Sequence, residues 1–175
     1  IVACVHAGVD SPPDLAREIA ERAAELQRRL EGEGIPLRIF YAAEIMVAPE
    51  VPEMVEAGLL PTVNGTRYCL LELPVAKLPE FVPHVIFELR VKGYMPIIAH
   101  PERNADVQRR PTRLLRLIEM GAIAQVSVPG LLGMFGRGAR KLAERLIKEG
   151  WAANLASDAH SAALLTARDR TGGLR

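Results

Sequence analysis

The side chains best suited to chemistry in this sequence are three histidines and three carboxylates spread along the chain. Each comes at or shortly after the end of a short apolar run, and together they are His6, Glu44, Glu72, His100, Asp158 and His160. Imidazole nitrogens mixed with carboxylate oxygens suit manganese, iron or zinc and are poor ligands for soft Cu(I). If these side chains meet in space, the sequence predicts a multinuclear metal site.

Hydrolysis of a phosphate ester is the reaction that such a site serves best. Two metal ions about 3.5–4 Å apart activate water at neutral pH and stabilise charge on both the attacking and the leaving oxygen. Arg103 follows His100 by three residues, so its guanidinium is expected at the mouth of the site, where it can grip phosphate oxygens. The alternative is a structural ion pair with Glu102 or Asp106. Arg168 follows the last two candidate ligands and is a second candidate for phosphate binding.

Other phosphate-transfer motifs are missing from the sequence. A C-x5-R loop at either cysteine would need arginine at position 10 or 75, where the chain has Asp10 and Val75. Neither G-x-S-x-G nor G-x4-G-K-[ST] occurs. The glycine-rich segment 133–138 lacks the lysine of a phosphate loop, and two interpretations stay open: an anion cradle at a helix start, or a plain strand-to-helix connection.

Six short apolar runs, alternating with stretches of helical character, are the elements that must position these residues. We expect strands at Ile1–Val5, Leu37–Tyr41, Tyr68–Leu73, Met95–Ala99, Ala122–Val128 and Ala152–Ala156. Continuous apolar runs of this length are typical of parallel strands covered on both faces. The carboxyl ends of such strands share one edge, so the candidate ligands should converge there. The fold class is α/β, either an open doubly wound sheet or most of a barrel.

The clearest helix signal is Ser11-Pro12-Pro13-Asp14, which predicts a helix with Ser11 as its N-cap. An apolar stripe of Leu15, Ile19, Ala23, Leu26 and Leu30 follows, and we expect it to pack into the core. Further helices are predicted over 80–92, 111–120 and 136–149. In the last of these, Ala139, Leu142, Ala143 and Leu146 should point inward.

Composition describes an ordinary globular chain. Its 175 residues carry a formal net charge of +1, with 49% hydrophobic and 25% charged residues, and favour one domain over 1–175. No Lys/Arg run exceeds two residues, which argues against a nucleic-acid partner. No segment reaches the about 20 apolar residues of a membrane span. Cys4 and Cys69 lie in apolar runs and are expected as free thiols, which favours a reducing, cytoplasmic location.

Several of these motifs together resemble one family. The segments IIAHPERN (97–104), LLELP (70–74) and ASDAH (156–160) look like those of the bacterial PHP-class (polymerase and histidinol phosphatase) tyrosine-protein phosphatases of capsule and exopolysaccharide gene clusters. The resemblance covers essentially the whole chain, and its further pieces are AEI (43–45), LPTVNGTRY (60–68), QVS (125–127) and GMFG (133–136).

This resemblance implies a distorted (β/α)7 barrel with two or three metal ions, usually manganese. It implies hydrolysis of phosphotyrosine on a bacterial tyrosine kinase that regulates exopolysaccharide, with a metal-bound hydroxide as nucleophile. The metal-ligand role carries over to the six residues named first, the phosphate-binding role to Arg103, and a second arginine role to Arg168. An oligomer is compatible with the sequence.

The chain departs from the family pattern in two places. The family opens with a strand ending in D-x-H-x-H, followed by another acidic ligand, and neither occurs here. We therefore expect a partial domain that begins at the second barrel strand, leaves the edge of Ile1–Val5 unpaired and binds metal incompletely. After Gln125, the chain reads Ser127-Val128-Pro129-Gly130 where the family often has Thr-x-x-Ser.

Two other functions stay open at this point. One is a small-molecule phosphatase of the histidinol-phosphatase type, and the other is a non-catalytic module that docks on a kinase. The missing D-x-H-x-H favours the docking module for these 175 residues. Retention of the six other ligands favours an enzyme for the parent protein, since a module without catalysis has no need of them.

Overall fold

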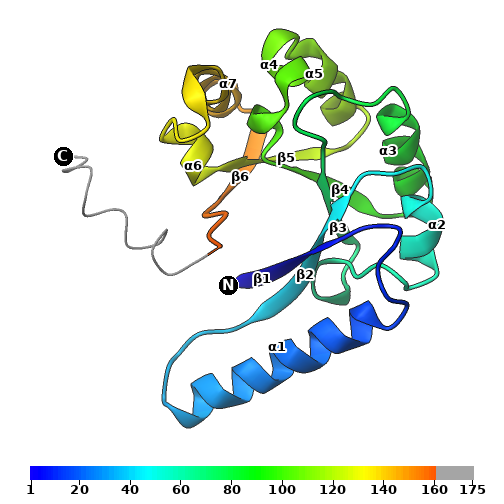
Figure 1. Ribbon diagram of the computed structural model, residues 1–175, viewed down its shortest axis with the longest axis vertical. Coiled ribbons are helices and arrows are strands. Elements are labelled where there is room, and N and C mark those ends of the chain that lie inside the picture. The colour runs from blue at the N-terminus through cyan, green and yellow to red at the C-terminus, as the bar shows by residue number, and fades with distance from the viewer. Residues whose placement is uncertain (161–175) are drawn as a thin grey trace.

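The computed structural model describes residues 1–160, and within this range six parallel strands form one curled sheet (Figure 1). Each strand pairs with the next in the chain, so the spatial order is β1-β2-β3-β4-β5-β6. The strands are β1 (Val2–Ala7), β2 (Phe40–Met46), β3 (Tyr68–Glu72), β4 (Met95–Ala99), β5 (Ile123–Ser127) and β6 (Ala152–Ala156). The result is an α/β half-barrel in which every connection is a crossover.

The connecting helices lie on the outer, convex side of the sheet (Figure 1). They are α1 (Leu15–Gly32), α2 (Val51–Glu56), α3 (Val82–Val91), α4 (Ala105–Arg109), α5 (Thr112–Glu119), α6 (Val128–Leu131) and α7 (Gly136–Lys148). Two 3-10 turns, η1 (Val63–Gly65) and η2 (Pro101–Arg103), complete the connections. Among the helices in residues 1–160, none has the length and apolar character needed to cross a membrane.

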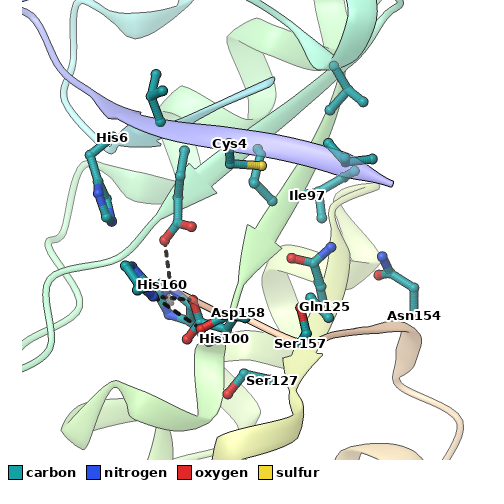
Figure 2. Close-up of a pocket in the computed structure, with 17 residues that line it drawn as sticks. Cys4, His6, Ile97, His100, Gln125, Ser127, Asn154, Ser157, Asp158 and His160 are labelled. Atoms are coloured by element: carbon teal, nitrogen blue, oxygen red, sulfur yellow. Dashed lines mark hydrogen bonds and ion pairs between the residues drawn. The ribbon is translucent and has the colours of Figure 1, made fainter. Parts of the chain in front are cut away.

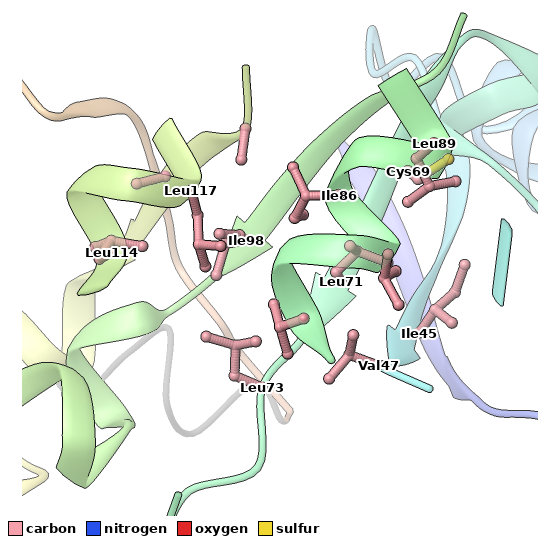
Figure 3. Packing of buried hydrophobic residues seen from close by; sticks show 14 of the residues in the cluster. Ile45, Val47, Cys69, Leu71, Leu73, Ile86, Leu89, Ile98, Leu114 and Leu117 are labelled. Carbon is pink, nitrogen blue, oxygen red and sulfur yellow. The ribbon is translucent and has the colours of Figure 1, made fainter. Parts of the chain in front are cut away.

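The hydrophobic core fills the space between the sheet and these outer helices (Figure 3). Leu71 of β3 and Ile98 of β4 point outward into it, and Ile86 of α3 and Leu117 of α5 meet them from the helix side. Cys69 is also buried as a free thiol, and burial raises its pKa to about 12. Packing on the convex face of the sheet therefore stabilises the fold, and the concave face can carry side chains that do not belong to this core.

The predicted strands are confirmed except at the second, which lies further along the chain than expected. Residues 37–39 do not join the sheet because the Gln27 amide occupies their backbone: Nε2 donates to Leu37 O at 3.2 Å, and Oε1 accepts from Ile39 N at 2.8 Å. The strand then runs from Phe40 to Met46. This shift places Glu44 inside the strand instead of after it.

The start and the packing of the first helix also differ from prediction. Ser11 is not an N-cap, because its Oγ accepts from Gly8 N at 2.9 Å and closes a turn, and the helix begins at Leu15. Ile19 is buried, but Leu26 is 42% exposed. The expected core stripe is thus confirmed at Ile19, only half-buried at Leu15, Ala23 and Leu30, and wrong at Leu26. Helix α1 lies beside β2 near the open edge of the sheet (Figure 1).

Helix α7 follows its prediction closely. It spans Gly136–Lys148, and the four residues expected to point inward, Ala139, Leu142, Ala143 and Leu146, are all buried. Unlike α1, this helix contacts two strands: β5, which precedes it in the chain, and β6, which follows it. The same helical pattern is therefore buried or exposed according to how much sheet lies beneath it.

A matched pair on α3 tests how the convex-face core holds the sheet. Leu89 is fully buried, whereas Val91, two residues later, is 66% exposed. We expect Leu89→Ala to lower the free energy of unfolding by about 2–5 kcal/mol through the cavity it leaves. Val91→Ala should change it by less than about 0.5 kcal/mol. Denaturant unfolding measures both, and equal losses would contradict the assigned packing.

Candidate active site

A cavity of about 510 Å³, lined by both apolar and polar side chains, opens on the concave face of the sheet (Figure 2). Side chains from all six strands of the described chain line it, together with the segment that follows β6. Figure 2 shows Cys4 and His6 on one side of the cavity and His100, Asp158 and His160 on the other. The cavity gathers five of the six predicted ligands, and the sixth, Glu72, borders an adjacent hollow that His6 also lines.

Strand register explains why these residues meet. His6 lies opposite Glu44 in the β1–β2 ladder, so their side chains share one face. Glu72 is the last residue of β3, and His100 directly follows β4. Residues separated by long stretches of chain therefore reach one end of the sheet, as predicted for parallel strands.

The tightest contact at the site joins His100 to Glu44. The imidazole Nε2 lies 2.6 Å from Glu44 Oε1, and the two side chains are 6% and 11% exposed. Burial alone would lower the pKa of His100, but the hydrogen bond and negative charge of Glu44 outweigh it, so that pKa is raised. Conversely, burial favours a protonated Glu44, but His100, with smaller effects of His6 and Arg103, holds its pKa below the usual value.

Two groups of three ligand-type residues share Glu44. His6, Glu44 and Glu72 form one group, and Glu44, His100 and Asp158 form the other, with ligand atoms in each group within 4.8 Å of one another. His100 Nε2 is also 3.9 Å from Glu72 Oε1, which links the groups. This mixture of nitrogen and oxygen donors fits manganese, iron or zinc, and Glu44 would serve as a ligand in either group.

His160 lies at the rim of the cavity. Its Nδ1 is 3.1 Å from the backbone oxygen of Asp158 and 3.8 Å from Oδ1 of the same residue, and its side chain is 58% exposed. Its ring stacks on that of His6, with 5.6 Å between centroids. These contacts connect the segment after β6 with β1 at the opposite edge of the sheet.

Arg103 lies beside the ligand groups. Its Nη1 is 3.4 Å from Asp158 Oδ2, and its guanidinium carbon is 4.5 Å from the centre of the Phe135 ring. The alternative partners predicted from the sequence have other contacts, because Asp106 pairs with Arg109 and Arg113 and Glu102 turns inward. The other predicted arginine, Arg168, lies outside the described residues.

Glu102 is an anchor that the sequence analysis missed. It is fully buried, and its Oε1 accepts from both the backbone N of Ser127, at 2.9 Å, and the Ser127 hydroxyl, at 2.6 Å. Among residues 1–160, its Oε2 has no hydrogen-bond partner. Because Glu102 immediately precedes Arg103, these bonds hold the arginine's turn against the end of β5. In the sequence, only Ser127 and the small residue Gly130 behind it could have indicated this contact, and they indicate it weakly.

The backbone is left-handed at two of the candidate ligands. His100 has φ 32° and ψ 53°, and Asp158 has φ 48°. Non-glycine residues adopt this region infrequently, at some cost in free energy. In both cases the turn directs the side chain from the strand end toward the cavity.

Cys4, Gln125 and Asn154 also face the cavity and were not singled out from the sequence. The available signal was alternation, since Cys4 lies two residues before His6 and Gln125 two before Ser127 on the same strand faces. Burial, with the nearby charges of Glu44 and Asp158, raises the pKa of the Cys4 thiol to about 11. Cys4 lines the cavity as a free thiol.

Fold and site together define an α/β half-barrel with a candidate multinuclear metal centre and an adjacent arginine. The family model for capsular polysaccharide synthesis proteins CpsB/CapC matches residues 1–168. The chain belongs to this CpsB/CapC family, which agrees with the resemblance noted in the sequence.

Individual relatives support the same assignment. The tyrosine-protein phosphatase YwqE of Bacillus subtilis is 36% identical over 143 residues, which cover 82% of this chain and 56% of the relative. The putative tyrosine-protein phosphatase CapC of Staphylococcus aureus is 36% identical over 137 residues, covering 78% and 54%. The chain thus spans a little over half the length of these curated relatives.

A solved structure matches the fold directly. It comes from the crystallography of YwqE from Bacillus subtilis and CpsB from Streptococcus pneumoniae, described as unique metal-dependent tyrosine phosphatases. The TM-score is 0.80 at 34% identity, covering 85% of this chain and 60% of the matched one. The curled parallel sheet is therefore an architecture that this chain shares with that structure.

The role of Glu102 as an anchor is tested at Gly130. A Cβ at this position would collide with the Glu102 carboxylate, so Gly130→Ala should lower the free energy of unfolding by about 1–3 kcal/mol. Gly32, at the end of α1, has open space around it, and Gly32→Ala should be neutral or stabilising. Thermal or denaturant unfolding compares the two variants, and a neutral Gly130→Ala would rule out the tight contact.

Proposed function

We propose that this protein is a metal-dependent phosphomonoesterase that removes phosphate from tyrosine side chains of proteins. The observation that carries the proposal is the position of Arg103 beside two ligand groups that share Glu44. A cluster of this kind next to a planar cation suits a phosphate dianion. The names of YwqE and CapC support tyrosine as the phosphorylated residue.

Mn²⁺ is the cofactor we propose, as two or three ions, and Fe or Zn would fit the same donors. His6, Glu44 and Glu72 would hold one ion, and Glu44, His100 and Asp158 another, with His160 completing the set at the rim. When bound, such ions activate water and offset negative charge on phosphate oxygens. The described side chains supply the nitrogen and oxygen donors that this requires.

Arg103 binds the phosphate in this proposal. Its guanidinium offers parallel N–H donors to two phosphate oxygens, and the Asp158 carboxylate, 3.4 Å from Nη1, orients it. Glu102 holds the turn from which Arg103 projects. Arg168 is proposed as a second phosphate-binding residue from the resemblance alone.

Cys4 does not serve as the nucleophile in this scheme. The chain has Asp10 where a C-x5-R loop starting at Cys4 would need arginine, and burial with the charges of Glu44 and Asp158 raises the pKa of the thiol. Attack by water is therefore the reaction that the cavity favours, with the carboxylates oriented by their contacts with His100. This separates the proposed mechanism from that of phosphatases with a cysteine nucleophile.

We further propose that residues 1–175 are part of one distorted (β/α)7 barrel domain. In the described part of the chain, β1 has a strand partner on one side only. Ile1, Val2 and Val5 are 65%, 47% and 41% exposed there. A further strand pairing with β1, and carrying the D-x-H-x-H ligands, would cover these residues and complete the metal centre.

The proposed substrate is a bacterial tyrosine kinase of exopolysaccharide assembly, as the resemblance implies, and the family's description as capsular polysaccharide synthesis proteins supports the link to exopolysaccharide. We place the reaction in the cytoplasm, where Cys4 and Cys69 stay as free thiols. Hydrolysis of histidinol phosphate in preference to a phosphotyrosine peptide would favour the small-molecule phosphatase instead.

Loss of the Arg103 guanidinium should impair turnover. For the full-length protein with Mn²⁺, Arg103→Ala is expected to lower kcat on a phosphotyrosine peptide by about 10²–10³, as for other groups that stabilise developing charge. Arg22→Ala, at a helix side chain that is 78% exposed, is the control and should retain full activity. A decrease below threefold for Arg103→Ala would contradict its role.

Measurement of the bound metal tests whether Glu44 is a ligand in both groups. Because Glu44 belongs to both groups, Glu44→Gln should lower the metal bound per protein more than Glu72→Gln, as measured by elemental analysis of the full-length protein. The same assay should find less metal on residues 1–175 alone than on the full-length protein. If the full-length protein binds no metal and cleaves no phosphotyrosine peptide, a non-catalytic docking module becomes the better interpretation.

A further inference from the structure

Three large apolar side chains are exposed close together between α6 and α7. Leu132, Met134 and Phe135 are 54%, 57% and 42% exposed, and we call residues 132–135 the apolar tip. Exposed apolar clusters on a protein surface commonly mark a binding site. The mechanism above uses none of these three side chains.

The backbone of the apolar tip is held in one conformation. Gly133 N donates to Gly130 O at 3.0 Å, Met134 N to Pro129 O at 3.0 Å, and Gly136 N to Gly133 O at 3.0 Å. Gly133 and Gly136 have φ values of 81° and 91°, which glycine adopts far more readily than other residues. The glycine-rich segment is thus a hydrogen-bonded turn that carries Phe135, which favours the plain connection over an anion cradle.

The Phe135 ring lies against the guanidinium that is proposed to bind the phosphate. One face of the ring contacts the Arg103 guanidinium at 4.5 Å, while 42% of the residue stays exposed. In an aryl phosphate, the ring is joined to phosphorus through a single oxygen. An aryl group whose phosphate is held by Arg103 therefore lies within reach of Phe135.

We propose that Phe135 determines specificity for aromatic phosphate esters by packing against the phenyl ring of phosphotyrosine, an inference that rests on the proposed function. Aromatic rings attract one another edge to face or offset-stacked, and the side chain of phosphoserine has no ring to offer. Met134 and Leu132 extend the same apolar surface for residues next to the phosphotyrosine.

The test compares Phe135→Leu with wild type in the full-length, Mn²⁺-loaded protein. Leucine keeps an apolar side chain but removes the ring. We expect kcat/KM for a phosphotyrosine peptide to fall about five- to tenfold, with competitive inhibition by inorganic phosphate unchanged within twofold. Phe135→Tyr should restore the peptide activity. Phe87→Leu, at an exposed phenylalanine on α3 (54% exposed), is the matched control and should behave as wild type.

Other results would overturn the inference in distinguishable ways. An unchanged kcat/KM on the peptide would show that Phe135 does not contact the substrate ring. Equal losses for the peptide and for inhibition by inorganic phosphate would make Phe135 only a positioning residue for Arg103. A wild-type protein that hydrolyses no phosphotyrosine peptide would instead refute the proposed function itself.

Discussion

Parallel pairing between consecutive strands is the constraint on which the rest of this structure depends. Because every strand runs in the same direction, every carboxyl end reaches the same edge, and side chains far apart in the chain become neighbours. The register that places His6 opposite Glu44 is fixed by backbone hydrogen bonds, so the polar cluster needs no attraction of its own to assemble. Alternation along each strand then separates two tasks: residues such as Leu71 face the helices and stabilise the fold, while residues such as Gln125 face the cavity.

Assembly of three carboxylates in one small space carries an electrostatic cost that cations must offset. In the described chain, His100 and Arg103 do this in part, by their contacts with Glu44 and Asp158. Divalent ions would do so more completely, and their binding would then add directly to the stability of the fold. The raised pKa of His100 and the lowered pKa of Glu44 are two consequences of the same charge balance. A single carboxylate, Glu44, therefore contributes both to the proposed metal binding and to the charge balance that affects the stability of the fold.

Much of this arrangement could be predicted from the sequence, because strand runs and the residues at their ends are local patterns. The meeting of His100 with Glu44 follows from the strand-end rule. What could not be predicted depends on contacts distant in sequence. The Gln27 amide shifts the start of β2. Ser127 donates to Glu102, whose carboxylate would be taken for a solvated charge from the sequence alone. The exposed Leu26 shows the same limit, since a helical stripe does not reveal how much sheet lies beneath it.

At His100 and Asp158, where the backbone is left-handed, the residue that would best stabilise the fold differs from the residue that the proposed chemistry needs. Glycine would fit both backbones with less strain, yet glycine has no donor atom to offer. Selection of this protein for heat resistance alone would therefore be expected to favour glycine at either position and to discard the ligand with it. Residues that persist against such a preference identify, without any assay, the places where a chain has been shaped by what it does and not by how firmly it folds.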